Sequence, residues 1–164
     1  MQFGRKAKSI IEVGCASNPF IKYLNWIQKR TCVAPYFADY GNGLNKLEVG
    51  SIIEAVTADF MEYELPNNDK YDLLVCSQVV EHVQNPSAFV QKLIRSAKTS
   101  IISIPYKWED CGSNCGHNTH EISYNRILEW SQPHVPIYST IVQEASLARR
   151  IIVVYQPDQK QLGL

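Results

Sequence analysis

The chain has 164 residues, of which 45% are hydrophobic and 20% charged, and its 16 basic side chains balance 16 acidic ones. This length predicts one domain over residues 1–164 with a core large enough to fold without metals or disulfides. Zero net charge argues against a nucleic-acid partner, which usually needs a basic excess. No apolar run approaches the roughly 18 residues of a membrane span. The first nine residues also lack the apolar stretch and cleavage site of a signal peptide.

Five cysteines, an odd number, do not indicate a complete disulfide framework. Cys15, Cys32 and Cys76 lie within or beside apolar runs, where a reduced cysteine behaves as a small buried hydrophobe. This usage predicts free thiols and a reducing, cytoplasmic compartment.

In chain order, the first part of the sequence predicts a strand over residues 9–13, a helix over 19–30, and strands over 33–39 and 52–58. The helix is predicted from apolar side chains at helical spacing and from Pro19, which a first helical turn accepts.

The second part predicts a strand over residues 71–77, a helix beginning near Pro86, a strand over 100–104, a helix over 123–131, and two final strands over 137–143 and 150–156. The alternation of strands and helices, closed by a hairpin, predicts an α/β fold with a mostly parallel sheet and helices on both faces. Ligands of such sheets bind at the carboxyl ends of the strands.

The turn after the first strand reads Glu12-Val13-Gly14-Cys15-Ala16-Ser17-Asn18. Gly14 permits a tight turn, and the small residues after it let the backbone approach a ligand. A nicotinamide-binding turn would have further glycines where Ala16 and Asn18 stand, so that alternative is disfavoured. Taken alone, the turn also fits an ordinary strand–helix corner.

Together with the rest of the chain, this turn resembles the first motif of class I S-adenosylmethionine-dependent methyltransferases, an acidic residue followed by Gly-x-Gly-x-Gly. Asp39 matches the acidic residue that holds the ribose hydroxyls in that family, and Asp59-Phe60 matches the pair beside the adenine. Residues 71–77 and 101–105 look like the fourth and fifth strands of the family.

The resemblance implies a Rossmann-like three-layer sandwich, with a mostly parallel seven-stranded sheet and an antiparallel C-terminal hairpin. It implies S-adenosylmethionine as the cofactor. The cofactor-binding positions that follow from it are Glu12, Gly14, Ala16, Asn18, Asp39, Asp59, Phe60 and Ser77.

Glu81-His82 follows the fourth strand, and His117 and His120 lie on the loop after the fifth; these four are the predicted catalytic residues. A base or a metal ion there would help a hydroxyl acceptor lose its proton. Some relatives hold a divalent ion with Glu-x-x-Glu-His and a later histidine. Gln78 replaces the first Glu here, and its amide is a poorer ligand, so a metal is not favoured. Metal ligation, base catalysis, and a cap and packing role all stay open for Glu81-His82.

The loop over residues 111–120 also contains Cys111 and Cys115. Two sulfurs and two imidazoles would satisfy tetrahedral zinc. The ligands are crowded on one short loop instead of standing in separated pairs, so structural zinc is disfavoured. The favoured interpretation places this loop over the active site, with Trp108 and both histidines facing the acceptor.

The favoured function is methyl transfer from S-adenosylmethionine to an oxygen or nitrogen of a small molecule or glycan. Residues 104–108 and 149–151, with the histidine loop, look similar to methyltransferases associated with bacterial surface polysaccharides. The rival hypothesis is a non-catalytic binding or scaffolding module of the same fold, which the weakened glycine turn supports. Because the sequence has little beyond a catalytic core, a partner subunit or a protomer of a homo-oligomer is expected to complete the acceptor pocket.

Overall fold

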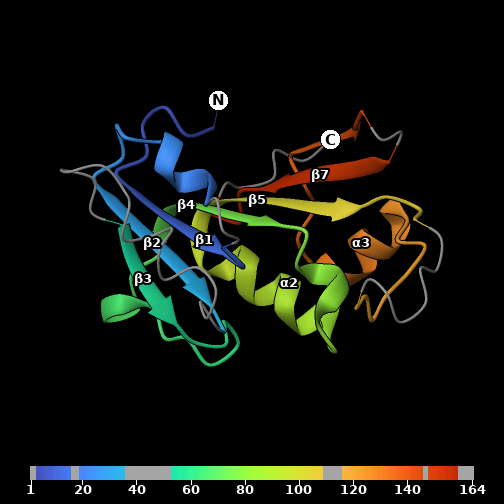
Figure 1. Ribbon diagram of the computed structural model, residues 1–164, viewed down its shortest axis with the longest axis horizontal. Helices are drawn as coiled ribbons and strands as arrows, with labels where there is room; N and C mark the ends of the chain where they lie inside the picture. Colours follow the sequence, from blue (N-terminus) through green and yellow to red (C-terminus); the bar gives the residue numbers. More distant parts are fainter. Residues whose placement is uncertain (1–2, 16–18, 36–52, 109–115, 146–147, 159–164) are drawn as a thin grey trace.

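The computed structural model describes residues 3–15, 19–35, 53–108, 116–145 and 148–158. These residues form a seven-stranded sheet in the order β3-β2-β1-β4-β5-β7-β6 (Figure 1). The strands are β1 (Ser9–Val13), β2 (Lys29–Ala34), β3 (Ile53–Thr57), β4 (Tyr71–Ser77), β5 (Ala97–Pro105), β6 (Tyr138–Gln143) and β7 (Arg149–Tyr155). The first five strands pair in parallel, whereas β7 pairs antiparallel with both β5 and β6. The predicted sheet and its antiparallel C-terminal hairpin are therefore confirmed.

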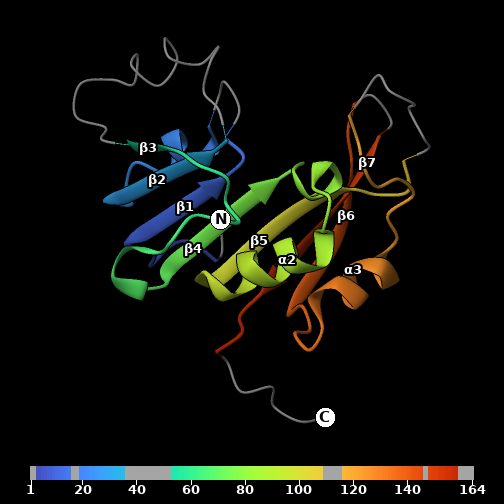
Figure 2. The ribbon, with the colours of Figure 1, turned by 90° about the horizontal axis from the view of Figure 1, so that it is seen from below.

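The two faces of the sheet are covered unequally by the described residues. Helices α2 (Pro86–Arg95) and α3 (Tyr124–Ser131) both lie against one face (Figure 2). On the other face lies a short 3-10 helix, η1 (Phe20–Tyr23). Side chains alternate between the two faces along β1, so that Ile10 packs with the η1 side and Ile11 with the helical side.

The helix predicted over residues 19–30 is wrong, because η1 ends at Tyr23 and β2 already begins at Lys29. The buried side chains of this segment, Ile21, Leu24 and Ile27, are spaced three residues apart. Side chains at i and i+3 are aligned in a 3-10 geometry, and the amides of Leu24 and Ile27 each bond three residues back. The prediction relied on Phe20, Tyr23, Leu24 and Ile27 at helical spacing, but Phe20 and Tyr23 are exposed.

The second strand also differs from the prediction of residues 33–39. The strand β2 ends at Ala34, immediately before Pro35, which has no N–H to donate to a sheet. Residues 36–39 lie outside the described residues.

Both predicted helices further along the chain are confirmed, each with an N-terminal cap. The Asn85 side chain accepts a hydrogen bond from the amide of Ala88 at 3.1 Å, and Pro86 occupies the first turn. The Ser123 hydroxyl accepts one from the amide of Arg126 at 3.3 Å. Within the described residues, no helix is both long and apolar enough to cross a membrane.

The start of β1 is fixed to β4 and β5 through the carboxylate of Asp72. It accepts hydrogen bonds from the amides of Lys8 (2.8 Å) and Ser9 (3.2 Å) and from the ammonium of Lys98 (2.8 Å). Burial raises the pKa of Asp72, but the bonds from Lys98 and Lys8 outweigh burial and leave the pKa below its usual value.

Candidate active site

A cleft of about 690 Å³ opens at the carboxyl edge of the sheet. Its walls come from the residues at the ends of β1, β2 and β4, from the turn after β3, and from α2. They are Val13, Gly14, Cys15, Val33, Ala34, Pro35, Asp59, Phe60, Gln78, Val79, His82, Val83, Phe89 and Gly116. The strand order reverses between β1 and β4, and ligands of open α/β sheets bind at such a reversal. The cleft also falls in the usual range of roughly 300–1,000 Å³ for small-molecule sites.

Gly14 allows the turn after β1 to pack against the turn after β4. Its φ of +78° lies in the left-handed region, and a Cβ there would stand 2.2 Å from the Cγ2 atom of Val79. The amide of Gly14 donates to the carbonyl of Val33 at 2.9 Å. The predicted glycine is thus a wall of the cleft, and its contact with a cofactor stays a prediction.

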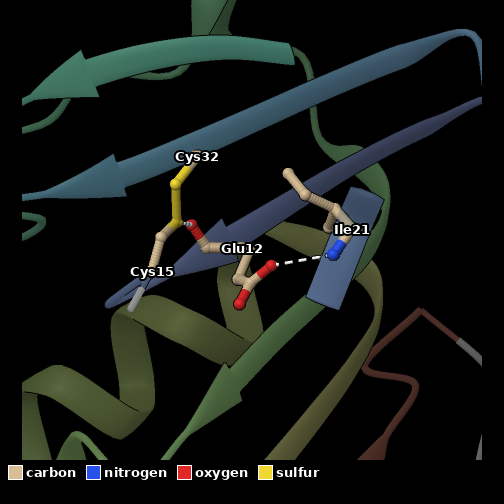
Figure 3. The surroundings of a disulfide bond; sticks show 4 residues. All are labelled: Glu12, Cys15, Ile21 and Cys32. Atoms are coloured by element: carbon tan, nitrogen blue, oxygen red, sulfur yellow. Dashed lines mark hydrogen bonds between the residues drawn. A yellow bond between two sulfur atoms is a disulfide. The ribbon is translucent and has the colours of Figure 1, made fainter. Parts of the chain in front are cut away.

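The Glu12 side chain bonds to the backbone of its own chain, and Glu12 is not among the residues that line the cleft. Its carboxylate, 8% exposed as a residue, accepts a hydrogen bond from the amide of Ile21 at 2.9 Å (Figure 3). Burial raises the pKa of Glu12, while hydrogen bonds from the amides of Ile21 and Phe20 oppose that rise. The carboxylate therefore holds η1 against the end of β1, and a direct role in cofactor binding stays a prediction.

The prediction that Cys15 and Cys32 are free thiols is wrong, because the two form a disulfide (Figure 3). They are 17 residues apart in sequence, and their Cα atoms are 6.0 Å apart. Parallel pairing of β1 and β2 places Glu12 beside Cys32, so the turn after β1 brings Cys15 over β2. Among the described cysteines, Cys76 is free and buried as predicted. The argument for a reducing compartment therefore loses two of its three residues.

Asp59 and Phe60 both lie in the cleft wall, where the resemblance placed the adenine. The Oδ1 atom of Asp59 accepts a hydrogen bond from the amide of Met61 at 2.8 Å, which fixes the carboxylate. The Phe60 ring packs edge-on against Phe89 with centroids 5.8 Å apart. Ser77 ends β4 but is not among the lining residues, whereas its neighbour Gln78 is.

Three other predicted cofactor residues, Ala16, Asn18 and Asp39, lie outside the described residues. So do Cys111 and Cys115, and structural zinc on their loop therefore stays untested.

A histidine cluster adjoins the cleft, and His82 belongs to both. The rings of His82 and His117 meet edge-to-face with centroids 4.8 Å apart. The ring of His120 is 5.9 Å from that of His117, and the ring of Trp108 is 6.0 Å from it. His82, His117, His120 and Trp108 therefore lie together, and the catalytic role of the three histidines stays a prediction.

Glu81 holds the loop that carries the histidines. Its carbonyl accepts hydrogen bonds from the amides of Asn118 (2.7 Å) and Thr119 (3.1 Å). Near them, the Nδ1 atom of His82 lies 2.9 Å from the carbonyl of Gly116. The short 3-10 helix η3 (Val80–His82) and the loop over residues 116–120 are therefore docked together.

The Glu81 side chain is a buried acid beside these rings. The residue is 1% exposed, and its Oε2 atom has no hydrogen-bond partner among the described residues. Burial raises the pKa of Glu81. Burial also lowers the pKa of His117, and the neighbouring His82 and His120 lower it further, so the His117 ring is neutral near pH 7.

A helical turn would place Gln78 on the same face as Glu81 or His82, three or four residues away, but Gln78 does not share such a turn with them. Its φ of +57° separates it from η3, which begins at Val80. The side-chain amide of Gln78 instead points back to the sheet, where it donates to the hydroxyl of Ser103 at 3.4 Å. Gln78 therefore lines the cleft, whereas the sequence had indicated it only as a weak metal ligand.

Solved structures with the same fold are similar to this chain at low sequence identity. One is the N-methyltransferase NodS from Bradyrhizobium japonicum WM9 in complex with S-adenosylhomocysteine, with a TM-score of 0.72, 13% identity, and coverage of 93% of this chain and 79% of NodS. Another is the [4+2]-cyclase SpnF, with a TM-score of 0.70, 11% identity, and coverage of 92% and 74%.

A third is the 1,6-didemethyltoxoflavin-N1-methyltransferase from Burkholderia thailandensis with its acceptor and S-adenosylhomocysteine bound. Its TM-score is 0.68, its identity 15%, and the coverage 94% of this chain and 72% of that chain. No curated protein sequence matches the chain significantly. At these identities the solved structures establish the fold alone.

The family is shown by a comparison of the sequence with models of protein families. The model of the methyltransferase domain family matches residues 2–140, which is most of the 164-residue chain. The family that the motifs indicated is confirmed: the chain belongs to the methyltransferase domain family.

Proposed function

We propose that the protein transfers a methyl group from S-adenosylmethionine to an oxygen or nitrogen of a small molecule or glycan. One observation carries this proposal: His82 lines the cleft and also belongs to the histidine cluster. Membership in the methyltransferase domain family supports it. The ligands of NodS and of the toxoflavin methyltransferase, which are properties of those proteins, support the choice of cofactor.

The cofactor is proposed to lie across the ends of β1, β2 and β3. The backbone of the Gly14 turn would approach it closely, and the Phe60 side would receive the adenine. The carboxylate of Asp59 is fixed beside that position and can accept a hydrogen bond from an amino group. Asp39 is proposed to hold the ribose hydroxyls.

The chemical step needs little from the protein beyond alignment and proton removal, because the sulfonium is already an activated donor. The acceptor oxygen would attack the methyl carbon, and the carbon–sulfur bond would break with its electrons returning to sulfur. The proton of a hydroxyl acceptor would pass to a neutral ring of the histidine cluster. His117 is suited to this role because burial lowers its pKa and keeps it neutral near pH 7.

A divalent cation is a second way to activate the acceptor, and one observation favours it. Within the described residues, Glu81, His82 and His117 offer ligand atoms that all lie within 4.8 Å of one another. One carboxylate and two imidazoles form a donor set that suits divalent first-row metals. A bound cation would acidify an acceptor hydroxyl. Metal analysis of the purified protein, and turnover after chelation and repletion, would test this alternative.

Titration calorimetry with S-adenosylhomocysteine tests the cofactor assignment. Binding is expected for the wild type, and Asp39→Ala should abolish it, whereas Asp69→Ala on a surface turn should not. Absence of binding by the folded wild type would favour the rival, a non-catalytic module. Unchanged affinity of Asp39→Ala would reject the ribose assignment alone.

Turnover tests the histidine assignment. A screen with tritiated methyl donor over sugars, nucleotide-sugars and phenols would identify the acceptor. His117→Ala should then lower turnover at least about a hundredfold with little effect on cofactor affinity. The matched control is His134→Ala, since His134 follows α3 and is not part of the histidine cluster. Equal turnover of the two variants would reject a base at His117.

Cytoplasmic localisation and a homo-oligomer stay proposals. Fractionation of the producing cell would test the first. Light scattering of the purified protein would test the second.

A further inference from the structure

The disulfide joins Cys15 in the cleft wall to the buried Cys32 of β2. Cys15 lines the cleft directly after Gly14. Its partner Cys32 is fully buried within β2, and the residues that follow it, Val33 and Ala34, also line the cleft. The covalent bond therefore fixes the turn after β1 to β2, two residues before that strand ends at Ala34 (Figure 3).

Hydrogen bonds between described residues also hold the two ends of the turn. The amide of Gly14 donates to the carbonyl of Val33 on the β2 side. The carboxylate of Glu12 accepts the amide of Ile21 at the far end of the turn. A reductant would leave these hydrogen bonds in place and remove only the covalent attachment.

We propose that the Cys15–Cys32 bond is a redox-sensitive tie that holds the cleft in its cofactor-binding shape, an inference that rests on the proposed function. A dithiol reductant would supply two electrons and two protons. Its thiolate would attack the Cys15 sulfur, Cys32 would leave as a thiolate and take up a proton, and the second thiol of the reductant would close a cyclic disulfide. The products are two cysteine thiols and one oxidised dithiol.

The cleft is also the route by which a reductant would reach the bond. Cys32 is fully buried, whereas Cys15 is 4% exposed and belongs to the cleft wall. A cofactor in the cleft would cover this route. The bound cofactor is therefore expected to slow reduction, which is an effect on a rate. The effect of reduction on binding is an equilibrium effect with a separate cause.

Reduction is expected to weaken binding because it frees the turn to move. A ligand must then order the turn when it binds, and this ordering lowers affinity. We expect the dissociation constant of S-adenosylhomocysteine to rise about tenfold, within the range of roughly 5–150-fold that is usual for coupling between two sites.

The test compares S-adenosylhomocysteine binding by calorimetry before and after dithiothreitol treatment. Cys32→Ala should bind as weakly as the reduced wild type in both buffers. Cys76→Ala is the matched control, because it removes a buried free thiol on β4 and should keep the full redox response. Near-UV circular dichroism must show that the reduced wild type stays folded; unfolding on reduction would make the bond a plain staple and overturn the proposal.

A second readout follows the bond itself. Dithiothreitol and an alkylating agent are added with and without S-adenosylhomocysteine, and peptide mass mapping follows labelling of Cys15 and Cys32. Saturating ligand is expected to slow labelling several-fold. Equal affinity of the oxidised and reduced forms would overturn this inference and leave the proposed function standing. Absence of binding by both forms would overturn the proposed function and this inference with it.

Discussion

Replacing Gly14 with alanine tests the close approach of the two turns at the cleft. A Cβ at this position would stand 2.2 Å from the Cγ2 atom of Val79, and the backbone φ is +78°. The left-handed conformation costs an alanine roughly 1–2 kcal/mol. Overpacking adds roughly 1–3 kcal/mol. Gly14→Ala should therefore lower the free energy of unfolding by about 2–5 kcal/mol, the sum of these two effects.

The companion variant Val79→Ala separates the two contributions. Without its two γ-carbons, residue 79 would leave only its Cβ near the new methyl group, at 3.4 Å, which is ordinary contact. A double-mutant cycle in urea should therefore return a favourable coupling of about 1–3 kcal/mol, so that Gly14→Ala made in the Val79→Ala background shows the conformational cost alone. The same stability loss with valine or alanine at position 79 would refute the steric reasoning. An unchanged stability of Gly14→Ala would refute both parts.

Three further predictions concern ionisable groups. Asp72→Asn should lower the free energy of unfolding by about 1 kcal/mol above pH 4. Because folding lowers the pKa of Asp72, this deficit should vanish as the pH falls through the folded pKa, which urea unfolding curves at several pH values would show. Folding raises the pKa of Glu81, so the free energy of unfolding should decline as the pH rises from 4.5 through the folded pKa and Glu81 ionises. Glu81→Gln should flatten this decline, and parallel curves of stability against pH for the two proteins would contradict the prediction. Turnover should fall at acid pH only once the lowered pKa of His117 is passed, below 6.5, and a limb that is unchanged in His117→Ala would assign it to another group.

The parts of the fold that are set by local patterns could be predicted from the sequence. The apolar run of β4 was placed at the bounds that the structure has, and Asn85-Pro86 marked the start of α2. The segment before β2 could not be predicted in the same way, because its apolar residues fit two periods. Phe20, Tyr23, Leu24 and Ile27 have helical spacing, whereas the side chains that are buried, Ile21, Leu24 and Ile27, follow a period of three. Which period is adopted depends on how few residues remain to reach β2.

The site shows the same division. The proximity of the histidines could be expected from the sequence, because two loops that follow neighbouring strands meet at the same edge of the sheet; their catalytic role stays a prediction. The Cys15–Cys32 bond was missed because it depends on the register of β1 against β2, which the sequence alone does not reveal. The role of Glu12 within its own turn was missed for a similar reason: its partner is a backbone amide nine residues away.

The central place of β1 in the sheet has a consequence for the order in which the chain can assemble. One neighbour, β2, follows within a few tens of residues, but the other, β4, is made 63 residues after it. A growing polypeptide that emerges from its amino end keeps one edge of β1 bare until Tyr71–Ser77 has left the ribosome. The edge of β5 likewise waits for β7. Arrested nascent chains of increasing length should therefore gain protease resistance in steps, with the last step only after Arg149–Tyr155 has emerged.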